Sequence, residues 1–174
     1  MLFRSSEDNL PVHPHPKPFI LVPGLQPSSS YKNQILIFRA LNKHLSEHRL
    51  ELILTGKNAE MNLRSYEPYN LLPNISIKYF TERDLLWHYR NALAVVYPSK
   101  EEGFGLPIIE SQAAGTLAIT CSNSSLREVG GNHAVYIEPD NELQLSEVID
   151  YLLIKNDKLF AQPQWKQRLS LNAD

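Results

Sequence analysis

Short apolar runs alternate with longer amphipathic stretches along most of this chain. Each apolar run is four to six residues long and ends at a proline, a glycine or a polar residue, which is typical of strands buried on both faces of a parallel sheet. In the stretches between them, apolar residues recur three or four positions apart, which predicts helices. The predicted strands are 19–22, 50–54, 75–80, 94–97, 117–120 and 134–137, and the predicted helices are 35–45, 81–93, 106–114 and 142–154.

This alternation predicts an α/β fold, a Rossmann-like parallel sheet with helices on both faces. Two segments do not follow the pattern. Residues 57–73 are polar, poorly periodic and interrupted by Pro68 and Pro73, so no element is predicted there. The remainder of the chain, to Asp174, is predicted to be helical.

The ordered domain is predicted to span residues 18–174, because residues 1–17 have no hydrophobic period and contain Pro11, Pro14 and Pro16. We interpret residues 1–17 as a linker or tail. His13 and His15 alternate with these prolines and raise the question of a metal site. A flexible, solvated tail is the favoured interpretation, because no other ligand lies near them in the sequence.

Composition restricts the possible function classes. Of the 174 residues, 43% are hydrophobic and 21% are charged, which is ordinary for a soluble globular domain. The net charge of -2 gives no reason to expect a nucleic-acid partner, which requires a basic face. With Cys121 as the single cysteine, no intrachain disulfide is possible. No apolar run approaches the ~20 residues of a membrane span. We therefore expect a cytoplasmic protein, with membrane contact only through other segments or a partner.

The segment with the clearest chemical signal is 99–110, which follows a predicted strand and opens a predicted helix. Ligands of open parallel sheets bind at the carboxyl ends of the strands. Gly103 and Gly105 allow a sharp turn and close approach of the backbone to a ligand. Together with the helix dipole, the first amides of the helix favour a phosphate group.

Two carboxylates flank this predicted anion site. Glu102 precedes the glycines and Glu110 lies eight residues further on, within the helix. A carboxylate can accept hydrogen bonds from the vicinal hydroxyls of a ribose or a hexose. The segment thus combines donors for a diphosphate with acceptors for a sugar. The alternative is structural, in which the glycines serve only a turn, Glu110 is a surface residue and Glu102 is a helix-start charge.

The 102–110 segment resembles the E-x7-E motif of family 4 glycosyltransferases, which are retaining enzymes with the GT-B fold. The resemblance covers roughly residues 18–154. The residues that carry it are Tyr97-Pro98-Ser99, Glu102-Gly103-Phe104-Gly105-Leu106-Pro107, Glu110, Ala114-Gly115-Thr116, Ser125-Leu126-Arg127-Glu128-Val129-Gly130, Pro139 and Asp140, with Gly24 and Lys32-Asn33 upstream.

The resemblance implies a role for each matching position. Glu110 would bind the ribose hydroxyls of the donor, and Glu102 would contact the transferred sugar. Lys32, in the loop that begins near Gly24, would stabilise the charge that develops on the leaving diphosphate. Amides of Gly103, Phe104, Gly105 and Leu106 would hold the diphosphate or sugar hydroxyls. Tyr79 and Phe80 fall where such proteins line the base pocket, although both could simply be core aromatics, which is the more common fate of such residues.

Three positions depart from the family pattern. Leu25 stands where an arginine often forms a second diphosphate clamp, which leaves Lys32 as the basic residue of this site. Leu117 and Arg127 each replace a proline, at positions that supply no ligand group. The sequence contains no Asp-x-Asp, so we expect neither a metal ion nor another cofactor, with the nucleotide-sugar acting as substrate.

The resemblance therefore implies the C-terminal, donor-binding half of a GT-B fold. Such an enzyme would move a sugar from a nucleotide-sugar to a glycan or other acceptor, in polysaccharide or glycoconjugate biosynthesis. The N-terminal acceptor domain is absent from these 174 residues, so we expect the isolated chain to be inactive. The alternative is a noncatalytic nucleotide-sugar-binding module or subunit, which the missing arginine favours.

Overall fold

Six short parallel strands form one sheet in a computed structural model, which describes residues 17–123 and 125–160. The predicted α/β class, with a Rossmann-like parallel sheet, is confirmed. The sheet order is β3-β2-β1-β4-β5-β6, and every neighbouring pair is parallel. The strands are β1 (Phe19–Val22), β2 (Glu51–Leu54), β3 (Ile75–Ile77), β4 (Ala94–Tyr97), β5 (Ala118–Cys121) and β6 (Ala134–Ile137).

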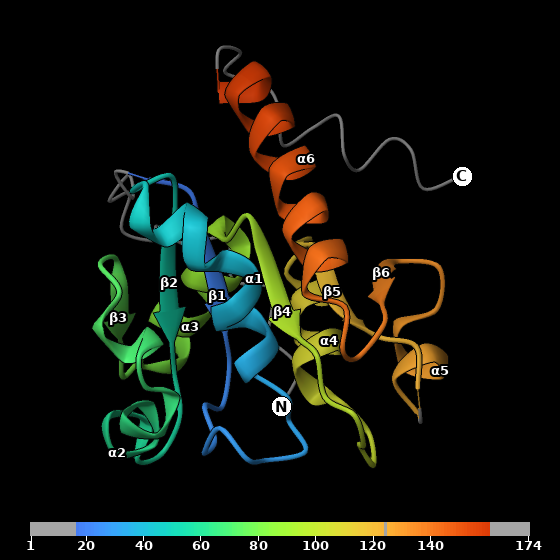
Figure 1. Cartoon of the computed structure of the whole chain (residues 1–174). Helices are drawn as coiled ribbons and strands as arrows, with labels where there is room; N and C mark the ends of the chain where they lie inside the picture. The colour runs from blue at the N-terminus through green and yellow to red at the C-terminus, as the bar shows by residue number, and fades with distance from the viewer. Residues whose placement is uncertain (1–16, 124, 161–174) are drawn as a thin grey trace.

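Helices cover both faces of the sheet, as predicted, because alternate residues of each buried strand point to opposite sides. Ile20 and Val22 of β1 belong to the core under α1 (Ile35–Ser46) and α6 (Glu142–Phe160). Phe19 and Leu21 belong to the core on the other face, under α3 (Glu82–Asn91). Also on that face, α4 (Leu106–Ala113) and α5 (Leu126–Gly130) pack together in a third cluster. Figure 1 shows α1 and α6 in front of the sheet, with α3 and α4 behind it.

The segment left without elements in the sequence analysis contains three short ones. They are α2 (Ala59–Leu63) and the 3₁₀ helices η1 (Arg64–Tyr66) and η2 (Tyr69–Leu71). Tyr66 is fully buried, and its ring packs 4.4 Å from that of Phe38 on α1. The prediction failed here because the elements are too short for a hydrophobic period and are stabilised by contacts with a distant helix.

Some predicted boundaries also need correction. The strand predicted over 75–80 ends at Ile77, because its neighbour β2 ends at Leu54, the pairing partner of Ile77. The last helix extends beyond the predicted Ile154 to Phe160. Residues 161–174 and 1–16 lie outside the described residues, so the helix predicted to reach Asp174 and the predicted tail stay predictions there. In the described ranges, no helix combines the length and apolarity that a membrane span requires.

The strand order places the direction reversal of the sheet between β1 and β4, which pair directly. From β1 the chain winds through α1 to β2 and β3, and then returns through α3 to β4 on the other side of β1. The loops that follow β1 and β4 leave the sheet at the same edge, at the bottom of Figure 1. Ligands of open α/β sheets bind at this kind of switch point. The predicted site residues Lys32 and Glu102 lie on these two loops.

Candidate functional site

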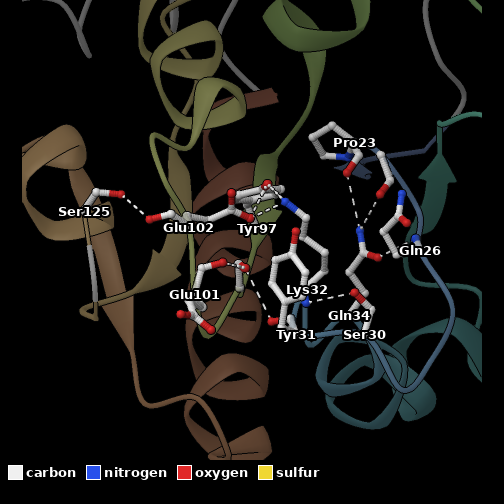
Figure 2. Close-up of polar contacts among 12 residues, drawn as sticks. Pro23, Gln26, Ser30, Tyr31, Lys32, Gln34, Tyr97, Glu101, Glu102 and Ser125 are labelled. Atoms are coloured by element: carbon white, nitrogen blue, oxygen red, sulfur yellow. Dashed lines mark hydrogen bonds and ion pairs between the residues drawn. The ribbon is translucent and has the colours of Figure 1, made fainter.

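Lys32 and Glu102, the two predicted catalytic residues, form an ion pair across the switch point. The side chain of Tyr97, the last residue of β4, joins them: its hydroxyl accepts a hydrogen bond from Lys32 Nζ at 2.7 Å and donates one to Glu102 Oε1 at 2.7 Å. Lys32 and Glu102 expose only 18% and 10% of their side chains. Figure 2 shows the three polar ends converging from two loops and a strand. Solvent therefore screens this pair only partly.

The electrostatics of the group favour a charged pair beside a neutral hydroxyl. Burial opposes ionisation of Glu102, but hydrogen bonds from Lys32, Tyr97 and Ser99 outweigh it and lower its pKa. Burial likewise works against a charged Lys32, yet its bonds to Glu102 and Tyr97 raise the Lys32 pKa above the ordinary value. Burial raises the pKa of Tyr97 to about 12. At neutral pH the site thus holds an ammonium, a carboxylate and a phenol.

Side-chain amides and backbone groups fix the loop that presents Lys32. The Gln34 side-chain oxygen accepts a hydrogen bond from the backbone amide of Gln26 at 2.9 Å. Its side-chain nitrogen donates to the carbonyls of Pro23 and Gly24, at 3.4 Å from each. Figure 2 shows this side chain spanning the loop. The carbonyl of Tyr31 accepts from the Lys100 amide at 2.8 Å, which ties this loop to the one after β4. Lys32 and Glu102 are therefore brought together by their backbones as well as by their charges.

The glycine loop after β4 opens α4 as the sequence predicted. Gly105 precedes the helix with φ +74°, and a Cβ there would lie 2.8 Å from Leu126 Cδ2. Gly105 is therefore required by the fold, whatever its role in binding. A Cβ on Gly103 would meet nothing within 4 Å, and the same holds for Gly24 after β1. The space above these two backbones is open to a ligand.

The helix start offers fewer amides than an ordinary N-terminus. No side chain caps α4, but Pro107 has no amide hydrogen and the Ile108 amide bonds to the Gly105 carbonyl at 3.0 Å. The helix itself thus contributes mainly the backbone amide of Leu106 to an anion site. The side chains of Leu106 and Phe104 are exposed. Donors for a phosphate would come mainly from the 103–106 loop.

Glu110, the second predicted carboxylate, has a different environment. It lies one turn into α4, half-buried, and its Oε2 accepts a hydrogen bond from the Tyr89 hydroxyl of α3 at 2.6 Å. Tyr89 is only 1% exposed. Burial, together with the adjacent carboxylate, raises the pKa of Tyr89 far above its ordinary range. Glu110 is thus paired with a neutral donor, whereas Glu102 is paired with a cation.

Three further positions from the sequence analysis are now placed. Leu25 is fully buried and its amide bonds to the Thr55 carbonyl, so this position points into the core. Tyr79 is 63% exposed beyond the end of β3, and its hydroxyl donates to Glu60 at 2.5 Å. Phe80 instead stacks on His88 of α3 at 3.9 Å between ring centroids. Tyr79 is therefore not a core aromatic, while Phe80 packs against a helix.

Two tyrosines of the site were missed as functional residues in the sequence analysis. Tyr97 ends the predicted strand 94–97 and belongs to the Tyr97-Pro98-Ser99 run that carries the family resemblance, whereas Tyr89 lies within the predicted helix 81–93. Both hydroxyls bond to a predicted site carboxylate. The usable signal is the residue type, because a tyrosine in a buried run requires a partner for its hydroxyl. The identity of that partner is not encoded locally.

Over the residues described, no group of three or more histidine, cysteine, aspartate or glutamate side chains is arranged to hold a metal ion. Metal-free donor binding stays a prediction.

Comparison with known proteins places this chain in a known family. The family profile described as "Glycosyl transferases group 1" matches residues 5–167, most of the chain. Among curated proteins, the O-antigen chain mannosyltransferase RfbU of Salmonella typhimurium is 44% identical over 63 residues, which are 36% of this chain and 17% of that protein. The chain thus spans about a sixth of the length of that relative.

Solved structures share the fold at low sequence identity. The catalytic domain of the cholesterol-alpha-glucosyltransferase from Helicobacter pylori matches with a TM-score of 0.64 and 16% identity, over 90% of this chain and 98% of that one. The Anabaena protein HepE in complex with UDP-glucose also matches with a TM-score of 0.64 and 16% identity, over 81% of this chain and 40% of that one. These likenesses support the Rossmann-like arrangement of the sheet.

Proposed function

The chain belongs to the family of group 1 glycosyl transferases, and we propose that it is the nucleotide-sugar-binding domain of a retaining glycosyltransferase. The complete enzyme transfers a sugar from a nucleotide-sugar to a glycan or other acceptor, in polysaccharide or glycoconjugate biosynthesis. The O-antigen mannosyltransferase among its relatives supports this class of pathway. The proposed location is the cytoplasm, which the single, buried Cys121 suits.

One observation carries the proposal: a lysine, a carboxylate and an open glycine loop meet at the switch point of a parallel sheet. Lys32 and Glu102 come from the loops after β1 and β4, and the backbone above Gly103 is unobstructed. A donor diphosphate at this edge would contact the Lys32 ammonium and the amides of the 103–106 loop. The ammonium stabilises charge on the leaving diphosphate, and this stabilisation is strong because the site is partly shielded from water.

The two carboxylates divide the sugar groups of the donor between them in this proposal. Glu102, next to Lys32, contacts hydroxyls of the transferred sugar near the bond that breaks. Glu110, further along α4, accepts hydrogen bonds from the ribose. No metal ion is needed, because the ammonium and the amides provide the positive potential that a cation would supply.

The first experiment is a thermal-shift titration of the 174-residue chain with UDP, GDP, ADP and their sugars, with and without magnesium. A ligand that binds the native state raises the melting temperature with its concentration. We expect at least one of these diphosphates to raise it equally well in both conditions. No shift with any of them at millimolar concentration would contradict the proposal, and a shift that requires magnesium would contradict its metal-free form.

The second experiment separates an enzyme domain from a noncatalytic binding module. The chain covers only 17% of its mannosyltransferase relative and 40% of HepE, in keeping with a further domain that binds the acceptor. We expect negligible sugar transfer by the isolated chain, because in this proposal it supplies only the donor side of the catalytic cleft. A two-domain protein that contains this chain and an acceptor domain should catalyse sugar transfer. A two-domain protein that binds the donor without any transfer or donor hydrolysis would favour the module.

A further inference from the structure

We infer that Tyr89 is a positioning residue, whose hydroxyl orients the Glu110 carboxylate for the ribose of the donor. This inference rests on the proposed function and extends it to a residue on a different helix. The contact is direct: Tyr89 on α3 donates to Oε2 of Glu110 on α4 at 2.6 Å. It connects two helices that pack side by side on the same face of the sheet.

Tyr89 is suited to fixing a flexible partner because its own side chain is packed in the core. Its side chain is 1% exposed and belongs to the cluster that contains Phe19, Leu21 and Val95. Its carbonyl also accepts a hydrogen bond from the Thr116 hydroxyl at 2.5 Å, which links α3 to the turn after α4. A glutamate side chain has three rotatable bonds. A hydrogen bond from the firmly held Tyr89 hydroxyl therefore restricts the directions in which Glu110 presents its carboxylate.

The chemistry of Tyr89 as a hydrogen-bond donor matters as much as its position. A phenol buried beside a carboxylate stays neutral, so it donates a hydrogen bond without cancelling the charge of Glu110. An ionised carboxylate has about four acceptor positions, of which the Tyr89 hydroxyl uses one. The remaining capacity suits the two vicinal hydroxyls of a ribose. The contrast is Glu102, whose carboxylate is bonded to the Lys32 ammonium as well as to the Tyr97 hydroxyl.

The test compares ribose with a sugar that lacks its hydroxyls. Binding of UDP, GDP and ADP to the 174-residue chain is measured by calorimetry beside binding of their 2′,3′-dideoxy analogues. We expect the wild-type chain to prefer the ribonucleotides by about 10- to 100-fold, since charge-assisted bonds to the two hydroxyls are lost in the analogues. Tyr89→Phe keeps the ring and removes one hydroxyl, and it should reduce this preference about 3- to 10-fold.

The ratio of ribonucleotide to dideoxynucleotide affinity distinguishes misorientation of Glu110 from a general loss of structure. Damage to the fold weakens binding of both nucleotide types, whereas misorientation of Glu110 weakens only the binding of ribonucleotides. Tyr136→Phe is the matched control, because Tyr136 lies on the edge strand β6 and its hydroxyl donates to the Gly131 carbonyl after α5. Its ratio should equal that of the wild type. The double variant Tyr89→Phe/Glu110→Gln should lose no more preference than Glu110→Gln alone, because both changes act through one carboxylate.

The possible outcomes distinguish the two levels of the argument. A wild-type chain that binds none of the diphosphates overturns the proposed function, and this inference with it. If the wild type binds ribonucleotides and dideoxynucleotides equally, the ribose assignment of Glu110 and the inference both fail, while the proposed binding of a nucleoside diphosphate stands. The inference also fails if Tyr89→Phe leaves the ratio unchanged or weakens both nucleotide types equally. Should Tyr89→Phe not fold, Glu110→Gln is measured in its place, and a ribonucleotide preference equal to that of the wild type overturns the inference.

Discussion

The two carboxylates of the 102–110 segment lie in opposite electrostatic settings. Glu102 forms an ion pair with Lys32 and accepts a hydrogen bond from Tyr97, with 10% of its side chain exposed. Glu110 accepts a hydrogen bond from the neutral Tyr89 hydroxyl, a contact that contains no cation. The two residues have the same side chain and are separated by one glycine loop and one helical turn. Their difference arises from what the neighbouring elements bring to each of them.

This difference matches the two tasks in the proposed function. At Glu102, a cation lies directly beside the carboxylate, which suits a site where charge develops and moves during a reaction. At Glu110, a neutral donor holds a charged acceptor, which suits steady recognition of hydroxyl groups. The following predictions test whether the two ends of the segment differ in this way.

The largest effect is expected at the charged end. Lys32→Met in the complete two-domain enzyme should lower turnover about 10²- to 10³-fold, because the charge that stabilises the leaving diphosphate is lost. Steady-state kinetics measure this effect. Lys43→Met is the matched control, since Lys43 is an exposed residue in the last turn of α1. Turnover within a few-fold of wild type would contradict the role of Lys32.

The second prediction separates the carboxylates. Glu110→Gln should weaken binding of the nucleoside diphosphate to the isolated chain about 10- to 100-fold, because charge-assisted bonds to the ribose are lost. Glu102→Gln should weaken it less, and in the complete enzyme it should reduce turnover more than affinity. Titration calorimetry and kinetics give the two values, with exposed Glu147→Gln as the control. Wild-type affinity in Glu110→Gln, or full turnover in Glu102→Gln, would refute the respective assignment.

The third prediction concerns the hydroxyl between the charges. Tyr97→Phe should lower the free energy of unfolding by about 1–2 kcal/mol, because Lys32 and Glu102 each lose a hydrogen-bond partner in a partly buried site. Urea denaturation of the isolated chain measures it. Tyr136→Phe should cost less, because the hydroxyl of Tyr136 bonds only to neutral carbonyls in the contacts described. Equal losses in the two variants would argue against the special position of Tyr97.

The smallest effect is the contribution of Glu102 to stability against acid. Its pKa is lowered in the folded chain, so the ionised form stabilises the fold above the ordinary pKa of 4.5, and this contribution is lost as the pH falls through the folded-state value. Glu102→Gln should therefore reduce the loss of unfolding free energy between neutral pH and pH 3 by less than about 1 kcal/mol. Asp150→Asn removes another carboxylate of lowered pKa, and its effect on the acid dependence is the reference for the size of the Glu102 effect. An unchanged acid dependence in Glu102→Gln would show that the ion pair adds no stability.

Local patterns were enough to determine the class of the fold and the place of the central loop. The buried runs of β1 and β4 are continuous in the sequence, and each is ended by a proline or by a polar loop, so period and punctuation identify them directly. The same holds for the start of α4, where Gly105 and Pro107 carry a conformational preference of their own. These features depend only on residues near one another in the chain.

Which groups touch was decided by the tertiary structure. Lys32 and Glu102 are 70 residues apart, and they meet because the strand order places β1 beside β4. Tyr89 and Glu110 are 21 residues apart and meet because α3 and α4 pack on the same face. The short helices between residues 59 and 71 exist for a similar reason, since a buried Tyr66 packs on a helix from another part of the chain. A hydrophobic period records which face of an element is buried, but pairing between elements depends on sheet order and side-chain direction, which no local stretch contains.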